Sequence, residues 1–394
     1  MISVREAKNI IETHVKPLLP VKISLGSAVN CILAEDVFSP VDIPAYPQSS
    51  MDGYAFRFED YASNKELQVD REVQAGNGQK WQLQPQQAAR IFTGAPVPDN
   101  ADTVVMQEKA SIIHNRLLIN DHTLAKGTNV RPKGGDIKQN ELAIAKDSYL
   151  SPAAVGFLAS IGITEVLIYP KPVVHIIATG KELQLLGKTL QYGQVYESNS
   201  IMLEAALQQQ HIGVMKKAIV DDDLQLLQNV LQSSLNASDV ILLTGGVSVG
   251  DYDFVVQACN ACGIQQKFHR IKQKPGKPLY FGKKDSKLVF GLPGNPSSVL
   301  TCFYEYVVPA LDAVCAKKKV NDILHLPLAE NINKKAGLTH FLKAKIIEGK
   351  VLPLGAQESY RLSSFALADG LIVFDEDQTD LKKGDLVEVH LLGR

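Results

Sequence analysis

Residues 242–255 read LLTGGVSVGDYDFV, an apolar run that stops at two glycines and continues into a small-residue loop with two aspartates. Such a run is typical of a strand that is buried on both faces of a sheet. The glycines leave no side-chain bulk behind the strand, so an anion could approach the backbone N–H groups. Two interpretations are open at this point: a simple turn, or a loop that holds an anionic, metal-bound ligand.

The same alternation of apolar strand and helix extends to both sides of this stretch. Strands are expected at 173–178, 213–220, 239–244, 267–273 and 288–291, and helices at 199–213, 221–235, 252–263 and 296–314. Alternation of this kind with continuous apolar strands is typical of a parallel sheet covered by helices on both faces. We therefore predict a doubly wound α/β domain over residues 169–318.

The flanking sequence predicts three further parts. Residues 45–136 are rich in Pro, Gly and short β-like runs and are predicted to form an inserted β-rich module. Residues 1–44 and 137–168 bracket it with helical signals: a capping box at Ser3–Glu6, a second short helix over 26–36, and a helix from Ser151 to Gly162. The tail, 319–394, is β-like throughout and is predicted to form a small β-barrel.

Composition excludes several classes of partner. The formal net charge is −1, so the chain as a whole attracts neither nucleic acid nor a membrane surface. No apolar stretch reaches the length of a membrane span, and the N-terminal sequence does not read as a secretory signal. Five cysteines in 394 residues do not form a disulfide framework, so a cytoplasmic location is expected. The pair Cys259 and Cys262 has metal-site spacing but lies in a helical apolar pattern, which favours packing.

The candidate site follows from the predicted sheet. Ligands of open parallel sheets bind beyond the carboxyl ends of the strands, where the loops 178–182, 221–223, 244–253 and 291–296 should converge. Glu182, Asp222 and Asp253 come from three of these loops. Acids beside a glycine-lined anion site would repel the anion unless a cation lies between them, and Mg²⁺ suits carboxylate and phosphate oxygens. The alternative is that each acid only caps a helix.

A basic segment, KFHRIKQKPGKP at 267–278, is the second candidate. It holds five Lys or Arg residues within 267–277 on a chain without net basicity. Arg270, Lys272 and Lys274 alternate at period two and would share one side of a strand, with Lys277 close by across a Pro-Gly turn. A rigid pair of lysines suits an oxyanion, whereas a solvated charged strand is the alternative.

Seven motifs in series then give a specific resemblance. They are PAYPQSSMDGYAF (44–56), TGAPVP (93–98), RPKGGDI (131–137), ATGKEL (178–183), TGGVSVGDYDF (244–254), KPGKP (274–278) and GLPGNPSS (291–298). In this order, over essentially the whole chain, they resemble the molybdopterin molybdenumtransferase family, which includes the C-terminal domain of gephyrin.

The resemblance implies an elongated, four-domain homodimer that binds adenylylated molybdopterin with Mg²⁺, releases AMP and inserts molybdate to form the molybdenum cofactor. It also implies contact with a molybdopterin adenylyltransferase and with apo-molybdoenzymes. The catalytic residues carried over are Asp52, Thr93, Asp136, Glu182, Asp222, Asp253, Arg270, Lys274 and Lys277, of which Asp222, Asp253 and Glu182 are the metal ligands. The substrate-binding residues are Thr179, Gly180, Thr244, Gly245, Gly246, Ser248, Gly250, Pro293, Gly294, Asn295, Pro278, Ser298, Lys343 and Ser359.

By the same resemblance, the β-rich module with Asp52, Thr93 and Asp136 completes the pocket of the partner subunit. Two positions depart from the family pattern: Arg270 stands where a lysine is expected, and Lys343 where an arginine is usual. Lysine lacks the planar fork that binds an oxyanion through two parallel bonds. Two alternatives remain open: a non-catalytic scaffold of the same fold, and a related nucleotide hydrolase or adenylyltransferase.

Overall fold

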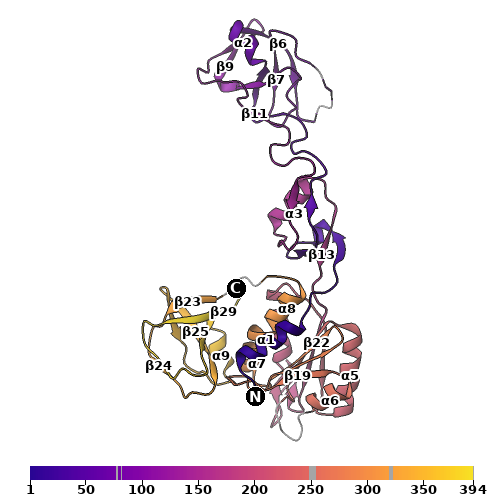
Figure 1. Ribbon diagram of the computed structural model, residues 1–394, viewed down its shortest axis with the longest axis vertical. Coiled ribbons are helices and arrows are strands. Elements are labelled where there is room, and N and C mark those ends of the chain that lie inside the picture. Colours follow the sequence, from indigo (N-terminus) through magenta and orange to yellow (C-terminus); the bar gives the residue numbers. More distant parts are fainter. Residues whose placement is uncertain (77–78, 81, 248–253, 319–322, 394) are drawn as a thin grey trace. The chain divides into compact units, whose positions relative to one another are not determined.

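The computed structural model describes residues 1–76, 79–80, 82–247, 254–318 and 323–393 (Figure 1). The chain divides into two compact units. The larger unit comprises Met1–Val21, Asn30–Ile32 and Leu167–Arg394, and the smaller comprises Lys22–Val29 and Leu33–Val166. Within the described residues, no helix is both long and apolar enough to cross a membrane.

The larger unit is built on a six-stranded sheet with the order β17-β14-β18-β22-β21-β19. Its strands are β14 (Val174–Thr179), β17 (Val214–Val220), β18 (Val240–Thr244), β19 (Gln265–His269), β21 (Tyr280–Lys284) and β22 (Lys287–Leu292). The first four in spatial order are parallel, as predicted, and β21 and β19 are antiparallel to their neighbours. The sheet is therefore mixed, because the short connection from β21 to β22 forms a hairpin and permits only antiparallel pairing.

Helices cover both faces of this sheet (Figure 1). On one face pack α1 (Val4–His14), α4 (Asn199–Gln209) and a continuous helical stretch of α7 (Pro296–Cys302), the π-helix η3 (Phe303–Val307) and α8 (Val308–Val314). On the other face pack α5 (Leu224–Ala237) and α6 (Val255–Ala261). The predicted capping box opens α1, because Ser3 and Glu6 each accept a hydrogen bond from the other's backbone N–H.

The C-terminal part of the larger unit is a β domain. Its sheet has the order β20-β25-β27-β29-β23, with β26 also paired to β25. The strands are β20 (Gln273–Lys274), β23 (Ile323–Pro327), β25 (Thr339–Ile347), β26 (Lys350–Pro353), β27 (Gly370–Phe374) and β29 (Leu386–Leu391). A bridge between Leu328 and Val351 brings the chain after β23 back to β26, which closes the sheet into a small barrel. A pair of short strands, β24 (Ile332–Asn333) and β28 (Asp380–Leu381), and the helix α9 (Leu362–Phe365) complete it.

The smaller unit contains the β-rich part of the chain. Its six-stranded sheet has the order β8-β5-β7-β6-β10-β9, with β5 (Gly53–Phe56), β6 (Glu66–Val73), β7 (Gln87–Ile91), β8 (Thr103–Met106), β9 (Ala110–Ile113) and β10 (Arg116–Ile119). The helix α2 (Phe58–Ser63) lies beside β6. The helix α3 (Pro152–Ser160) begins as predicted, with the Ser151 side chain accepting from the Ala154 N–H.

Short elements make up the rest of both units. They are β1 (Val21–Ser24), η1 (Leu25–Ser27), β2 (Ile32–Leu33), β3 (Val37–Phe38), β4 (Gln48–Ser49), η2 (Gln107–Lys109), β11 (Val130–Arg131), β12 (Leu142–Ile144), β13 (Glu165–Tyr169), β15 (Leu183–Gln184) and β16 (Val195–Tyr196). The parallel pair β15–β16 lies in the segment that follows β14.

Two local predictions are wrong. The segment 26–36 is not a helix but the 3₁₀ turn η1 followed by β2, because Asn30 adopts a positive φ of 63° that no α-helix accommodates. The segment 267–273 is not one strand: β19 ends at His269, Arg270 turns the chain with a φ of 80°, and β20 belongs to the barrel sheet. Period-two alternation therefore does not place Arg270, Lys272 and Lys274 on one side.

Candidate active site

Two of the predicted loops meet at the carboxyl edge of β14. The hydroxyl of Thr179, the last residue of β14, donates to Asp222 Oδ1 at 3.0 Å. The backbone N–H of Lys181 donates to the other carboxylate oxygen of Asp222 at 3.3 Å. The Asp222 carboxylate is thus held against the turn after β14, although its oxygens keep lone pairs for a further partner.

Glu182 lies over the same turn. A Cβ placed on Gly180 would be 2.8 Å from both carboxylate oxygens of Glu182, so the acid is folded back onto the glycine. Glu182 and Asp222 therefore both contact residues 179–181. Hard carboxylate oxygens of this kind fit Mg²⁺. Among the described residues, no group of three or more His, Cys, Asp or Glu is arranged to hold a metal ion. The third predicted ligand, Asp253, lies outside the described residues, as do Ser248 and Gly250.

The glycine turn after β18 packs directly on this edge. Gly245 has a φ of 88°, and a Cβ there would lie 2.1 Å from the backbone oxygen of Thr179. No side chain fits in that space, because real Cβ atoms never approach a backbone oxygen so closely. Gly246 also has a positive φ, and the Cβ position of Gly294 is 4.0 Å from the Gly245 Cα. The turns after β18 and β22 therefore lie side by side with bare backbone.

Asn199, the first residue of α4, joins these two turns and was not predicted. Its Nδ2 donates to the Thr244 hydroxyl at 3.0 Å and to the Gly294 carbonyl at 2.8 Å. Thr244 in turn donates to the Pro293 carbonyl at 3.1 Å. The carbonyl partner fixes the amide orientation, because a flipped side chain would oppose two oxygens. The sequence signal that could have identified Asn199 is a polar residue at the start of a helix expected near the carboxyl edge of the parallel sheet.

The C-terminal barrel also contributes a residue, Ser359, to the candidate site. Asn295 Nδ2 donates to the Ser359 hydroxyl at 2.9 Å, and the Ser297 N–H donates to the Ser359 carbonyl at 3.2 Å. Ser298 follows in the first turn of α7 and is buried. Ser359, Asn295 and Ser298, all predicted, thus gather around the start of α7.

The turn KPGKP packs against the same helix. A Cβ on Gly276, whose φ is 85°, would lie 2.6 Å from Cys302 Sγ and 3.6 Å from the Ser298 carbonyl. The side chains of Lys274 and Lys277 are exposed on either side of the buried Pro275–Gly276 pair. Neither ammonium forms an ion pair within the described ranges. Burial, with the nearby charges of Lys274 and Lys334, lowers the pKa of His340 to about 4, which locates Lys274 beside that ring.

Pro278 follows Lys277 and is half-buried, and Arg270 lies at the bend before β20. Lys272, which was not assigned to the site, is bound elsewhere: its Nζ lies 2.7 Å from Glu376 Oε1. The basic segment therefore does not act as one cluster. Lys274 and Lys277 flank the turn, whereas Lys272 forms an ion pair with Glu376 of the barrel.

Lys343 does not present its charge to the site. It is 2% exposed on β25, and its ammonium donates to the carbonyls of Ala356 at 2.8 Å and Arg361 at 3.1 Å. Burial lowers the pKa of Lys343. Both acceptors belong to the loop that carries Ser359, so Lys343 is hydrogen-bonded to that loop. Its predicted substrate-binding role stays a prediction.

The remaining predicted residues belong to the smaller unit. Asp52 Oδ1 accepts from the Thr93 N–H at 2.7 Å and from the Thr93 hydroxyl at 2.8 Å. These hydrogen bonds, the backbone one first, lower the pKa of Asp52. Asp136 is exposed on the segment before Ile137. The structure thus brings Asp52 and Thr93 together.

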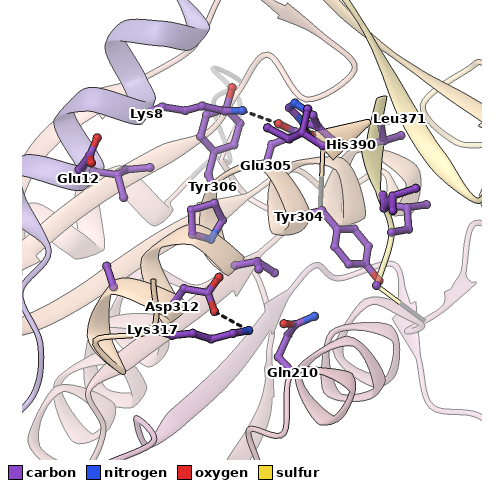
Figure 2. A pocket seen from close by; sticks show the side chains of 18 of the residues that line it. Lys8, Glu12, Gln210, Tyr304, Glu305, Tyr306, Asp312, Lys317, Leu371 and His390 are labelled. Carbon is purple, nitrogen blue, oxygen red and sulfur yellow. Dashed lines mark hydrogen bonds and ion pairs between the residues drawn. The ribbon is translucent and has the colours of Figure 1, made fainter. Parts of the chain in front are cut away.

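A cavity of about 450 Å³ in the larger unit is separate from these residues (Figure 2). None of the predicted site residues lines it. Several charged residues of its wall form ion pairs: Glu305 Oε2 lies 2.6 Å from Lys8 Nζ and Glu305 Oε1 lies 2.7 Å from His390 Nδ1. Asp312 and Lys317, near the end of α8, form a second ion pair in this wall. The candidate site is therefore the set of loops at the carboxyl edge of the sheet, and this cavity is separate from it.

Comparison with known proteins gives matches over nearly the whole chain. Three family descriptions match the chain: the MoeA N-terminal region (domain I and II) over residues 2–162, a probable molybdopterin binding domain over 175–313, and the MoeA C-terminal region (domain IV) over 325–392. A protein named molybdopterin molybdenumtransferase from Staphylococcus epidermidis is 33% identical over 401 residues, covering 99% of this chain and 95% of that protein. One of the same name from Haemophilus influenzae is 31% identical, covering 94% of each chain.

A solved structure gives the same result for the fold. The crystal structure of a molybdopterin biosynthesis MoeA protein from Pyrococcus horikosii has a TM-score of 0.84 and 30% identity, covering 100% of this chain and 99% of that one.

Proposed function

We propose that this chain, which belongs to the molybdopterin molybdenumtransferase family, is a transferase that makes molybdenum cofactor. Its substrates are adenylylated molybdopterin and molybdate. The P–O–P bond is cleaved with addition of one water and AMP leaves, while the two dithiolene thiols replace two oxo groups of molybdate, which leave as water with the thiol protons and two solvent protons. Relatives with this enzyme name align over nearly the whole chain, which supports catalysis rather than a purely scaffolding role.

The observation that carries the proposal is the turn of Gly245 against Thr179, with the Asp222 carboxylate bonded to the same threonine. Bare backbone N–H groups favour a phosphate, and an adjacent acid favours a metal ion that bridges to it. A nucleotide-like pyrophosphate bound with a divalent cation satisfies both requirements. A simple turn satisfies neither.

We assign the cation to Mg²⁺, held by Asp222 and Glu182 together with Asp253. When bound, Mg²⁺ neutralises charge on the phosphate oxygens as the anhydride breaks. Lys274 and Lys277 hold molybdate by charge, with Pro278, Ser298 and Ser359 forming its pocket. The glycines of the turns after β14, β18 and β22 support the phosphates through their backbone.

We further propose a homodimer in which the inserted module of a second copy supplies Asp52, Thr93 and Asp136 to this site. The short bonds between Asp52 and Thr93 support that role, because they hold an ionised carboxylate ready on the module. A co-expressed pair of Asp52→Asn and Asp222→Asn subunits would then recover activity that neither homodimer has. The four-part division of the chain at residues 45, 137, 169 and 319 belongs to the same proposal, as do contacts with an adenylyltransferase and apo-molybdoenzymes.

We place the reaction in the cytoplasm, which fits the finding that none of the five cysteines, all among the described residues, forms a disulfide.

The direct test measures AMP release from adenylylated molybdopterin with molybdate, with tungstate and with neither, each in Mg²⁺ or in excess chelator. Asp222→Asn should lower the Mg²⁺-dependent rate at least about a hundredfold. The matched control is Asp221→Asn, which changes an exposed neighbouring acid. Equal rates for the two variants would remove Asp222 from the metal site. Absence of oxyanion-dependent AMP release from the wild-type protein would refute the function itself.

A further inference from the structure

The turn KPGKP is held from the inside by a buried glutamine. Gln273, which precedes the turn, is 1% exposed. Its Nε2 donates to the carbonyls of Pro275 at 3.0 Å and Gly276 at 3.1 Å. Its Oε1 accepts a hydrogen bond from the Tyr306 hydroxyl. Every donor and acceptor of the amide is therefore used, and two of the partners are consecutive carbonyls of the turn.

Tyr306 is fully buried and lies in the π-helix η3. π-helical turns are rare and occur frequently at functional sites, because the wider turn re-aims side chains. Here Tyr304, Glu305 and Tyr306 all line the cavity of Figure 2. The Tyr306 hydroxyl donates to Gln273 Oε1. Through this hydrogen bond, Tyr306 supports the glutamine that holds the turn.

The consequence concerns the two exposed lysines. Pro275 and Gly276 are buried, and the Cβ position of Gly276 is only 2.9 Å from Gln273 Nε2. The backbone between Lys274 and Lys277 therefore cannot shift without breaking the amide's bonds. This frame fixes the backbone positions from which the two lysine side chains extend, and neither ammonium has an acidic partner among the described residues.

We propose that Gln273 and Tyr306 are positioning residues for oxyanion capture. They touch neither substrate nor metal. They hold the turn in the one conformation in which Lys274 and Lys277 bind the same anion, so that molybdate affinity depends on a buried amide and a buried phenol. The inference rests on the proposed function, because it requires that the two lysines bind an oxyanion.

The variants are Tyr306→Phe, which deletes only the hydroxyl, and Gln273→Met, which keeps the shape and removes all the hydrogen bonds of the amide, including a longer one from Nε2 to Cys302 Sγ at 3.6 Å. Tyr304→Phe is the matched control, because its hydroxyl lies in the same helical segment but donates to Gln209 Oε1 at 3.1 Å. Three quantities are measured for each: the molybdate Kd by equilibrium dialysis without pterin, the kcat and KM of AMP release, and Tm.

We expect the molybdate Kd and KM to rise about fivefold in Tyr306→Phe and about tenfold or more in Gln273→Met. The KM for adenylylated molybdopterin and the kcat should stay near wild type. Tyr304→Phe should leave the molybdate Kd unchanged even if it lowers Tm. A role in stability alone would lower Tm in all three variants and leave the molybdate Kd unchanged, which would overturn the proposal.

A double-mutant cycle supplies the second readout. If Tyr306 acts through the lysines, Tyr306→Phe should cost no further molybdate affinity once Lys274 and Lys277 are both alanine. Full additivity would overturn the inference while leaving the proposed function intact. Wild-type protein that binds molybdate in dialysis but releases no AMP would refute the function and still test the positioning residues. Wild-type protein that binds no molybdate would refute the inference.

Discussion

Replacing Glu305 by glutamine should destabilise the larger unit by about 3 kcal/mol. Glu305 is 2% exposed and lies 2.6 Å from Lys8 Nζ and 2.7 Å from His390 Nδ1 (Figure 2). Removing one partner of a buried ion pair costs about 3–5 kcal/mol, because the other charge stays buried and unpaired. The lower end applies here, since the Lys8 side chain is 32% exposed and recovers some water.

The measurement is thermal unfolding of the wild-type protein and Glu305→Gln at pH 7. A loss of about 3 kcal/mol corresponds to a fall in Tm of about 6–12 °C for a unit of this size. The control is Glu388→Gln, which removes the partner of the other ring nitrogen of His390. Its side chain is 42% exposed, so the expected cost is below about 1 kcal/mol. Equal effects of the two substitutions, or a Tm unchanged by Glu305→Gln, would refute the buried-pair reasoning.

The same pair has a defined pH dependence. Burial opposes the charge on His390, but the hydrogen bond and charge of Glu305 outweigh it, so the pKa of His390 is raised. A base with a raised pKa stabilises the fold fully below its unfolded pKa of about 6.5, and this stabilisation is lost as pH rises through the folded value. The difference in unfolding free energy between the wild-type protein and Glu305→Gln should therefore be larger at pH 6 than at pH 9.

Three other substitutions test the structure at separate points. Gly245→Ala should lower AMP release at least about a hundredfold, because the new Cβ would lie 2.1 Å from the Thr179 oxygen and displace the turn; Gly187→Ala, with a similar φ and open space, is the control. Lys343→Arg should leave the molybdate Kd unchanged in dialysis. It should lower the free energy of unfolding by about 1–3 kcal/mol, because the larger guanidinium must enter a filled site. A tighter molybdate Kd would show that this position contacts the oxyanion. His175 is buried with both ring nitrogens lacking a partner within the described chain, and burial, reinforced by Lys216, lowers its pKa. The wild-type protein should thus lose stability as pH falls through about 6.5 in chemical unfolding, and His175→Leu should lose less; equal slopes would contradict this.

The fold was predictable wherever one physical rule governed a long segment. Continuous apolar runs gave the parallel strands, and the geometry of a parallel sheet was enough to bring Thr179 and Asp222 together across 43 positions of sequence. The helix starts at Ser3 and Ser151 followed from capping chemistry, which is local. The mixed character of the sheet did not follow, because the pairing direction of β21 depends on a hairpin that apolar periodicity does not encode.

The contacts that complete the site were beyond sequence reasoning for a different reason. Asn199 meets Thr244 and Gly294, and Tyr306 meets Gln273, through hydrogen bonds between elements whose approach depends on packing of the whole unit. Nothing in the residues themselves marks Asn199 as the link between two turns, or Gln273 as buried with its amide nitrogen and oxygen both hydrogen-bonded. In the basic segment, the sequence predicted too much order. Alternation predicted one strand over 267–273, but a positive φ at Arg270 separates β19 from β20.

Lys343 shows how burial decides the role of a charge. The family resemblance placed this position at the oxyanion, and a lysine there seemed a weaker form of the usual arginine. Its ammonium instead donates to the carbonyls of Ala356 and Arg361, which hold the loop bearing Ser359. The Lys343 ammonium is hydrogen-bonded to these two carbonyls and the residue is only 2% exposed, so it contributes little attraction to an anion at the protein surface. In the function proposed above, the attraction then comes from Lys274 and Lys277, which extend from the same turn. Because position 343 offers no exposed guanidinium, we expect the rigidity of the KPGKP turn to supply the oxyanion affinity that a planar fork would otherwise give.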